Sequence, residues 1–157
     1  QNQNAFHVWQ MFSAHLTHLS WEHFIGNAIG IALLQQVYGH CFRAVSWLWV
    51  IAGLMLFISS GLMLLSVKLI WYGGLSGLIV GLTSYAALID QRHHTRFNTL
   101  VISALVVYSS FLCFRGEIVA GLGAVPVASL SHLWGMIGGM TIAVGVNLSH
   151  NRNKSRL

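Results

Sequence analysis

Three separate segments of the chain bring together the side chains that a serine hydrolase uses. They are His18-Leu19-Ser20-Trp21-Glu22-His23-Phe24-Ile25-Gly26-Asn27, Gly73-Gly74-Leu75-Ser76-Gly77 and Ser131-His132-Leu133-Trp134-Gly135. In such chemistry a serine hydroxyl attacks a carbonyl carbon, a histidine takes the hydroxyl proton, and N–H donors stabilise the oxyanion. Each segment stands near the start of a long apolar run, where a polar side chain is costly and marks a functional site. The residue types therefore predict hydrolytic chemistry inside a membrane.

The composition places these segments in an integral membrane protein. Of 157 residues, 55% are hydrophobic and only 7% are charged, whereas a soluble domain carries about 25% charged residues. We expect an all-α polytopic protein with one domain over residues 1–157, because spans of roughly 20 residues leave no room for a soluble module. The five expected spans are about 16–38, 43–66, 70–89, 97–114 and 125–148. The net charge of +5 lies in short loops and the tail, so it reflects membrane topology and not nucleic-acid binding.

Polar and glycine-containing stretches separate the expected spans. These breaks are Tyr38-Gly39-His40 with Arg43, then Val67-Lys68, then 90–96, then 115–123. Pro126 stands where the last helix is expected to begin, a position at which proline is tolerated. Gly73 and Gly74 predict that the third span enters the membrane as a loop before its helix begins.

The basic residues predict the orientation of the chain. With five spans and the N-terminus outside, one face receives only Lys68 and Arg115, and the other receives Arg43, Arg92, Arg96, Arg152, Lys154 and Arg156. Because cytoplasmic loops carry the excess of Lys and Arg, we expect the C-terminus in the cytoplasm. Spans one, three and five then start at the outer face. His23, Ser76 and His132 would each lie about six or seven residues inside, roughly 10 Å below the outer surface.

Ser76 is the predicted nucleophile and His132 its general base. Taken alone, a serine in an apolar helix more often bonds its own backbone, and a histidine often joins two helices. Glycines beside Ser76 favour the catalytic interpretation, because they free backbone N–H groups for a ligand. We therefore expect the N–H groups of Ser76 and its neighbour Leu75 to be oxyanion donors. His23 and Asn27, four residues apart on one helix face, are expected to donate to the same oxyanion.

Glycines at helical spacing explain how the serine and histidine helices would meet. Gly135 and Gly139 follow His132 on the same face, and Gly77 and Gly81 form the matching strip after Ser76. Small residues let two membrane helices approach closely. We expect the two strips to pack together and to bring His132 within reach of the Ser76 hydroxyl.

The remaining polar residues receive structural interpretations. No carboxylate is placed to orient His132, which favours a Ser–His dyad, and Glu22 is expected to face water or a polar neighbour. His15 and His18 are expected to make structural hydrogen bonds. No metal or cofactor is expected, because His15, His18 and His23 do not share one helix face and no cysteine joins them. Cys41 and Cys113 are expected near opposite membrane faces, too far apart for a disulfide.

Together these motifs resemble those of the rhomboid intramembrane serine proteases. The pattern H-x4-H-x3-N appears as His18, His23 and Asn27, the pattern G-x-S-G as Gly74-Leu75-Ser76-Gly77, and the pattern H-x2-G-x3-G as His132, Gly135 and Gly139. The resemblance covers almost the whole chain and implies a rhomboid-like helical bundle. It also implies that Ser76 is the nucleophile, that His132 is its base, and that His23 and Asn27 assist the oxyanion.

The sequence that flanks these motifs is most similar to that of the rhombosortase branch. The cues are Ser13-Ala14-His15-Leu16-Thr17-His18-Leu19-Ser20-Trp21-Glu22-His23 and Val125-Pro126-Val127-Ala128 before His132-Leu133-Trp134-Gly135. That branch implies a bacterial inner-membrane enzyme whose active site opens to the outer side. It implies a transmembrane substrate with a C-terminal Gly-Gly motif, a membrane helix and a basic end, whose tail is removed.

Three features depart from the family pattern. Rhomboids usually have six core spans, and the first has no counterpart here, consistent with a first residue that is Gln and not Met. Gln10 follows Trp9 where many members have Trp-Arg, and Val80 stands where some members carry an aromatic that stacks on the catalytic histidine.

The alternative function is a catalytically inactive rhomboid-like protein that binds transmembrane segments. A small channel or transporter subunit is disfavoured, because paired half-helices are not evident.

Overall fold

Five long helices and one short one make up most of the computed structural model, which describes residues 8–18, 20–42, 47–65, 73–114, 119–120, 126–127 and 129–154. The helices are α1 (Gln10–Ser13), α2 (Trp21–Tyr38), α3 (Trp47–Leu65), α4 (Ser76–Ile89), α5 (Thr95–Phe114) and α6 (Ser129–Lys154). Three 3₁₀ helices join them, at Ala14–Leu16, Gly39–Phe42 and Asp90–Arg92. The expected all-helical architecture is thus confirmed for the described residues, apart from one small pair of strands.

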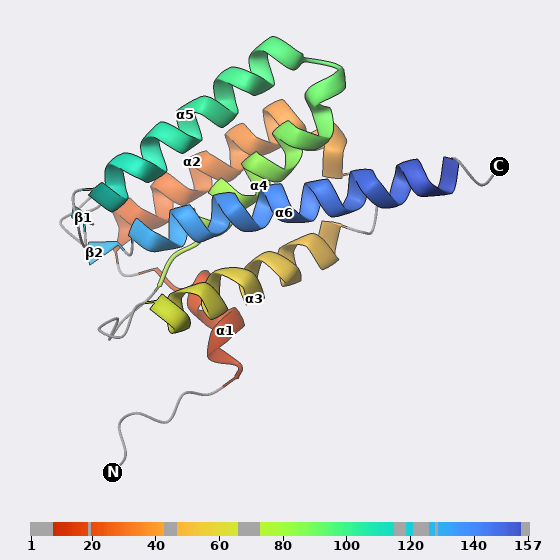
Figure 1. Ribbon diagram of the computed structural model, residues 1–157. Coiled ribbons are helices and arrows are strands. Elements are labelled where there is room, and N and C mark those ends of the chain that lie inside the picture. Colours follow the sequence, from red (N-terminus) through yellow and green to blue (C-terminus); the bar gives the residue numbers. More distant parts are fainter. Residues whose placement is uncertain are drawn as a thin grey trace.

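Helix direction alternates along the chain, so that three helices begin at one end of the bundle. Figure 1 shows α2, α4 and α6 running in one direction, and α3 and α5 in the other. α4 is the central helix, because it packs against α2, α3, α5 and α6. Most of its side chains are buried, including Leu78, Leu82 and Ala86. A helix of only 14 residues is held in place by neighbours on every side.

Local sequence explains where two of these helices begin. The Ser20 hydroxyl caps α2 by accepting a hydrogen bond from the His23 backbone N–H at 3.2 Å, a preferred arrangement at helix N-termini. α4 begins directly at Ser76, after residues Gly73 to Leu75 outside the helix. Gly74 has φ +140°, a conformation that favours glycine. The expected loop before the third helix is confirmed, although its depth in a membrane stays a prediction.

The start of the last helix differs from the expectation. Pro126 does not begin this helix but lies in β2 (Pro126–Val127), which pairs antiparallel with β1 (Val119–Ala120). α6 begins at Ser129 and continues to Lys154, beyond the expected end at 148. Proline fits an edge strand as well as a first helical turn, because both accept its fixed φ and missing N–H. Two of the other breaks are confirmed, since α2 ends at Tyr38 and the 3₁₀ helix Asp90–Arg92 separates α4 from α5.

Length and apolarity identify three candidate membrane spans among the described residues. They are Trp47–Leu64, Thr95–Leu112 and Ser129–Ser149. α2 and α4 correspond to the other two expected spans but do not meet the same measure of length and hydropathy. The chain is therefore an integral membrane protein with several candidate spans. Lys68, Glu117, the break at Val67-Lys68 and parts of 115–123 lie outside the described residues, as do the basic residues Arg43, Arg115 and Arg156.

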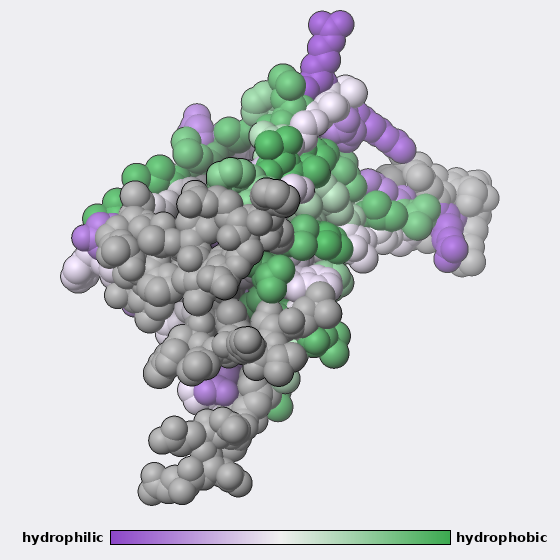
Figure 2. Space-filling view, turned by 60° about the vertical axis from the view of Figure 1, so that its left-hand side comes forward, coloured by the Kyte–Doolittle hydropathy of each residue, from purple (hydrophilic) through white to green (hydrophobic). Residues whose placement is uncertain are grey.

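Large hydrophobic side chains are exposed on the outside of the bundle. Leu64 on α3 is 77% exposed, and Leu100 and Val107 on α5 are each 69% exposed. Figure 2 shows hydrophobic side chains, in green, over much of the coloured surface. Such broad apolar exposure is unfavourable in water and fits a bundle surrounded by lipid.

Candidate functional site

Three of the predicted site residues lie in the first turns of three parallel helices. His23 is the third residue of α2, Ser76 the first of α4 and His132 the fourth of α6. These helices begin at the same end of the bundle (Figure 1). Their helices start later than the expected spans, so each residue is closer to its helix start than we anticipated. The three nevertheless keep matching positions at one end of the molecule.

Ser76 stands at a helix N-terminus, where backbone N–H groups are available to a ligand. The Ile79 N–H already bonds the Leu75 carbonyl oxygen at 2.9 Å as the helix begins. The first N–H groups of a helix have no acceptor within it, and the helix dipole adds partial positive charge there. The preceding loop is held in position because the Gly74 N–H donates to the Ala14 carbonyl oxygen at 3.1 Å. An anion beside Ser76 would therefore be favoured.

Glycine contacts between α4 and α6 set the spacing of the serine and histidine helices, which form the most extensive helix pair among the described residues. A Cβ atom on Gly135 would overlap the Gly77 carbonyl oxygen, and one on Gly139 would overlap the Gly81 carbonyl oxygen. A Cβ atom on Gly77 would lie 2.9 Å from the Ser131 carbonyl oxygen. The residue after Ser76 thus touches the residue before His132.

One further polar contact joins this helix pair, through the Ser84 hydroxyl. The Ser84 hydroxyl lies 3.0 Å from the Gly81 carbonyl oxygen on its own helix and 3.1 Å from the Met136 carbonyl oxygen on α6. A buried hydroxyl that bonds across helices supports close backbone approach. The contact continues the glycine strips by one turn away from Ser76.

His132 is buried, with an exposed fraction of 4%. Its Nδ1 atom has no hydrogen-bond partner among the described residues. Its ring packs edge-to-face against Tyr108 of α5, with ring centroids 5.7 Å apart at 69°. In the part of the chain that the structure describes, the Ser76 hydroxyl and the His132 imidazole form no hydrogen bond. The dyad therefore stays a proposal.

Tyr108 is the site neighbour that the sequence interpretation missed. Its ring contacts His132 from α5, where we expected only an apolar span. A signal was present, because Tyr108 lies six residues before Phe114, at the end of α5. Counted from the outer end of its expected span, Tyr108 would lie at about the same depth in the membrane as Ser76 and His132.

His23 and Asn27 lie buried on α2, and His23 lies beside the loop that leads to Ser76. Their exposed fractions are 8% and 5%. A Cβ atom on Gly74 would lie 2.5 Å from His23 Cε1 and 3.0 Å from Nε2. The imidazole of His23 therefore lies directly against the loop that leads into α4.

Buried polar atoms without a hydrogen-bond partner concentrate at this end of the bundle. Five of the eight such atoms in the described residues belong to it: His18 Nε2, His23 Nδ1 and Nε2, Asn27 Nδ2 and His132 Nδ1. Leaving such a group unsatisfied costs about 1–3 kcal/mol, and native proteins rarely do so without a reason. These groups come from α2, from the segment just before it and from α6. Their concentration indicates a site prepared for a polar ligand.

The other polar residues of this region make different contacts. His15 has a structural role as expected, since its Nε2 lies 3.2 Å from the Met55 carbonyl oxygen and 3.1 Å from the Ser59 hydroxyl of α3. His18 instead makes an edge-to-face ring contact with His23, at 5.5 Å between centroids. Glu22 is exposed on α2. Neither Glu22 nor any other described carboxylate makes a hydrogen bond to His132.

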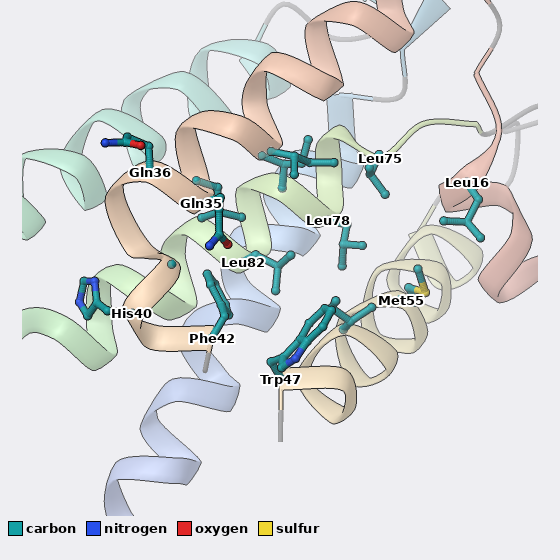
Figure 3. A pocket seen from close by; sticks show the side chains of 15 residues that line it. Leu16, Gln35, Gln36, His40, Phe42, Trp47, Met55, Leu75, Leu78 and Leu82 are labelled. Atoms are coloured by element: carbon teal, nitrogen blue, oxygen red, sulfur yellow. The ribbon is translucent and has the colours of Figure 1, made fainter. Parts of the chain in front are cut away.

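An apolar cavity lies next to the site but does not contain it. It has a volume of about 730 Å³ and lies between α2, α3 and α4, with Leu34, Met55, Leu75, Leu78 and Leu82 in its lining. Figure 3 shows Leu75 and Leu16 toward one end and His40 and Phe42 toward the other. Ser76, His23 and His132 do not line it. The cavity suits an apolar occupant, and Leu75 is the one candidate site residue in its lining.

Comparison with known proteins gives one match. A family model described as Rhomboid domain matches residues 5–148, which is most of the chain and includes every candidate site residue. No curated protein and no solved structure is similar enough to the chain to count as a match.

Proposed function

Because the chain belongs to the rhomboid family, we propose that it is an intramembrane serine endopeptidase that cleaves transmembrane proteins near the outer membrane face. The observation that carries this proposal is the group of buried, unsatisfied imidazole and amide atoms around the N-terminus of α4. Family membership is consistent with this activity. We propose the roles of the single residues together with this activity.

The chemistry needs one nucleophile, one base and a set of donors. Neutral His132 accepts the hydroxyl proton of Ser76 while Oγ attacks the carbonyl carbon of the scissile bond. The oxyanion accepts hydrogen bonds from the backbone N–H groups of Ser76 and Leu75 and from the side chains of Asn27 and His23. His132 then gives the proton to the leaving amine. A water molecule, deprotonated by His132, hydrolyses the acyl-enzyme and restores Ser76.

The positioning of His132 would depend on packing and not on a carboxylate. Tyr108 contacts its ring from one side, and the glycine strip of α6 fixes its helix against α4. A ring contact of this kind contributes about 0.5–1.5 kcal/mol. This is enough to favour one imidazole orientation several-fold over others.

Tyr108→Leu should therefore lower the turnover of a transmembrane substrate about tenfold, whereas Tyr108→Phe should keep most of it. The reason is that phenylalanine preserves the ring edge and leucine does not. Val107→Ala is the matched control, because Val107 is the next residue on α5 and is 69% exposed. Equal turnover in Tyr108→Leu and wild type, measured on purified protein in vesicles, would show that this ring does not position His132.

Asn27→Ala should lower turnover about 10²–10³-fold without destabilising the fold. One oxyanion donor is worth about 2.7–4 kcal/mol in catalysis, and the Asn27 Nδ2 atom has no hydrogen bond to lose. Asn98→Ala is the contrasting variant, since Asn98 is buried, donates to Asp90 and accepts from Tyr38. Asn98→Ala should lower the unfolding temperature in detergent. If Asn27→Ala keeps its rate, or fails to fold, Asn27 has a structural role.

Membership of the rhomboid family implies transmembrane substrates in general, and the flanking sequences allow a more specific proposal. The rhombosortase-like sequence of residues 13–23 and 125–128 supports a substrate class with a Gly-Gly pair outside a C-terminal membrane helix and a basic cytoplasmic end. Glycine has low helix propensity, so it eases the local unwinding that exposes a scissile carbonyl. The excess of basic residues on one face supports a cytoplasmic C-terminus and an active site that opens to the outer side of a bacterial inner membrane.

The test is to incubate the purified protein in vesicles with a transmembrane substrate that carries this tail, and to locate the cut by mass spectrometry. We expect cleavage near the outer end of the substrate helix, beside Gly-Gly. A cut at the cytoplasmic end would contradict the proposed orientation and depth together. Cleavage near the outer face without any need for Gly-Gly would remove only the substrate proposal.

The alternative is a rhomboid-fold protein that binds transmembrane segments without cleaving them. It is favoured by one observation, which is that Ser76 and His132 form no hydrogen bond among the described residues. A fluorophosphonate probe separates the two functions, because it reacts only with an activated serine. Labelling that is lost in Ser76→Ala supports the protease. A folded wild-type protein that binds substrate but neither labels nor cleaves supports the binding protein.

A further inference from the structure

The end of the bundle opposite Ser76 holds a buried carboxylate surrounded by polar side chains. Asp90 follows the last residue of α4 and is only 5% exposed. Its Oδ1 lies 3.2 Å from His40 Nε2, and its Oδ2 lies 2.8 Å from His94 Nδ1. The Asn98 side-chain amide donates to Oδ2 at 3.0 Å. A buried carboxylate is expensive unless its partners compensate, so this cluster invites a functional explanation.

Cys41 brings a thiol to the same place. It follows His40 in the 3₁₀ turn Gly39–Phe42 and is not in a disulfide. One imidazole nitrogen of His40, Cys41 Sγ and a carboxylate oxygen of Asp90 all lie within 4.8 Å of one another. The two segments are about 50 positions apart in the chain, yet they place a nitrogen, a sulfur and an oxygen donor around one point. That is a set of ligand types found in zinc sites.

We propose that His40, Cys41 and Asp90 form a binding site for a divalent transition metal of the zinc type, with a water molecule as the fourth ligand. Two nitrogen or oxygen ligands on a tetrahedral zinc ion lie about 3.3 Å apart when each bond is about 2.0 Å long. The 3.2 Å separation of His40 Nε2 from Asp90 Oδ1 matches that edge. A thiol with an imidazole favours Zn²⁺ and Co²⁺ over Mg²⁺ and Ca²⁺, which prefer oxygen alone.

The groups behind the carboxylate are arranged as supports for a metal ligand. His94 and Asn98 both bond Oδ2, whereas His40 bonds Oδ1. A metal ion at Oδ1 would replace the hydrogen bond from His40 and leave the two bonds to Oδ2 in place. The Tyr38 hydroxyl donates to Asn98 Oδ1 at 2.8 Å and fixes the amide in turn. Partners of this kind orient ligating carboxylates, and their loss typically weakens metal affinity about 10–100-fold.

Charge at the site is compatible with a cation. Burial opposes ionisation of Asp90, but hydrogen bonds from Asn98, His94 and His40 outweigh it and lower the pKa of the carboxyl group to about 2. The carboxylate is therefore ionised at neutral pH. Burial, aided by the negative charge of Asp90, raises the pKa of the Cys41 thiol to about 11. A metal ion would displace the thiol proton on binding, as such ions do at cysteine sites.

A bound metal would join the end of α2 to the end of α4. The same α4 begins with Ser76 at its other end, so the site would anchor the helix that carries the candidate nucleophile. The rival explanation is a hydrogen-bonded cluster that joins α2, α4 and α5 without any metal. The two explanations differ in one measurable property, which is whether the Cys41 thiolate binds an ion.

Cobalt spectroscopy on the full chain in detergent, purified without a polyhistidine tag, tests the proposal. Addition of Co²⁺ should give thiolate-to-cobalt charge-transfer absorption that saturates at one equivalent and disappears on addition of Zn²⁺ but not of Mg²⁺. Cys41→Ser should lose this absorption, whereas Cys113→Ser should keep it. Asn98→Ala should weaken Co²⁺ binding about 10–100-fold.

A second readout guards against variants that fail to fold. Zn²⁺ should raise the unfolding temperature of the wild type, because a ligand that binds only the folded state stabilises it. The rise should vanish in Cys41→Ser and persist in His93→Gln, whose histidine is exposed on the neighbouring loop. Absence of the charge-transfer absorption in folded wild type, or its persistence in Cys41→Ser, would overturn the proposal. None of these measurements depends on proteolytic activity.

Discussion

Ser76→Ala and His132→Ala should each lower the turnover of a transmembrane substrate at least about 10⁴-fold, while both proteins stay folded in detergent. Loss of the nucleophile or the base of a serine hydrolase removes about 5.5 kcal/mol of transition-state stabilisation, which corresponds to this fall in rate. The two losses should not add in the double variant, because the residues act as one unit. Turnover is measured on purified protein in vesicles, with unfolding temperature as the test of folding.

Stability separates a catalytic role from a structural one at both positions. Ser76 is half-buried at a helix start, so its truncation should leave the unfolding temperature unchanged. His132→Ala also loses the ring contact with Tyr108, which costs about 0.5–1.5 kcal/mol. Ser110→Ala and His93→Ala are matched controls, because both residues are exposed. Near wild-type turnover in either folded variant would show that the Ser76–His132 dyad is wrong.

The order of helices and their shared end could be predicted from the sequence. Five apolar runs, separated by polar breaks, correspond to α2 through α6, and Ser76, His23 and His132 lie toward one end of the bundle because alternate helices begin there. Helix direction follows from chain connectivity alone once the spans are known. That is why counting residues from each span start aligned these positions even though the helix starts were misplaced.

Contacts between helices were harder to predict, because rotation of each helix about its axis depends on packing. The interaction of Tyr108 with His132 needs the rotation of α5 relative to α6, and an apolar run without periodicity does not specify it. Pro126 was misplaced because proline is accepted by both a first helical turn and an edge strand. The cluster around Asp90 joins three loop or helix ends whose proximity appears only in the folded chain.

Gly135→Val should lower both stability and activity. A Cβ atom at this position overlaps the Gly77 carbonyl oxygen, so α6 must move away from α4 to admit any side chain. Overpacking of this kind costs about 1–3 kcal/mol. Because Gly77 follows Ser76, the same displacement would increase the distance between Ser76 and His132. Turnover should fall at least tenfold, since small misplacements of catalytic groups are costly.

Gly145→Val provides the control on the same helix. Nothing lies within 4 Å of a Cβ atom at Gly145, so the substitution should change neither property beyond the small helix-propensity difference. The measurements are thermal unfolding in detergent and turnover in vesicles for both variants. A Gly135→Val protein that matches Gly145→Val in both would mean that the α4–α6 contact tolerates separation. The positions of Ser76 and His132 would then have to be set by something other than the glycine strips, with Tyr108 as the remaining described contact that restrains the imidazole.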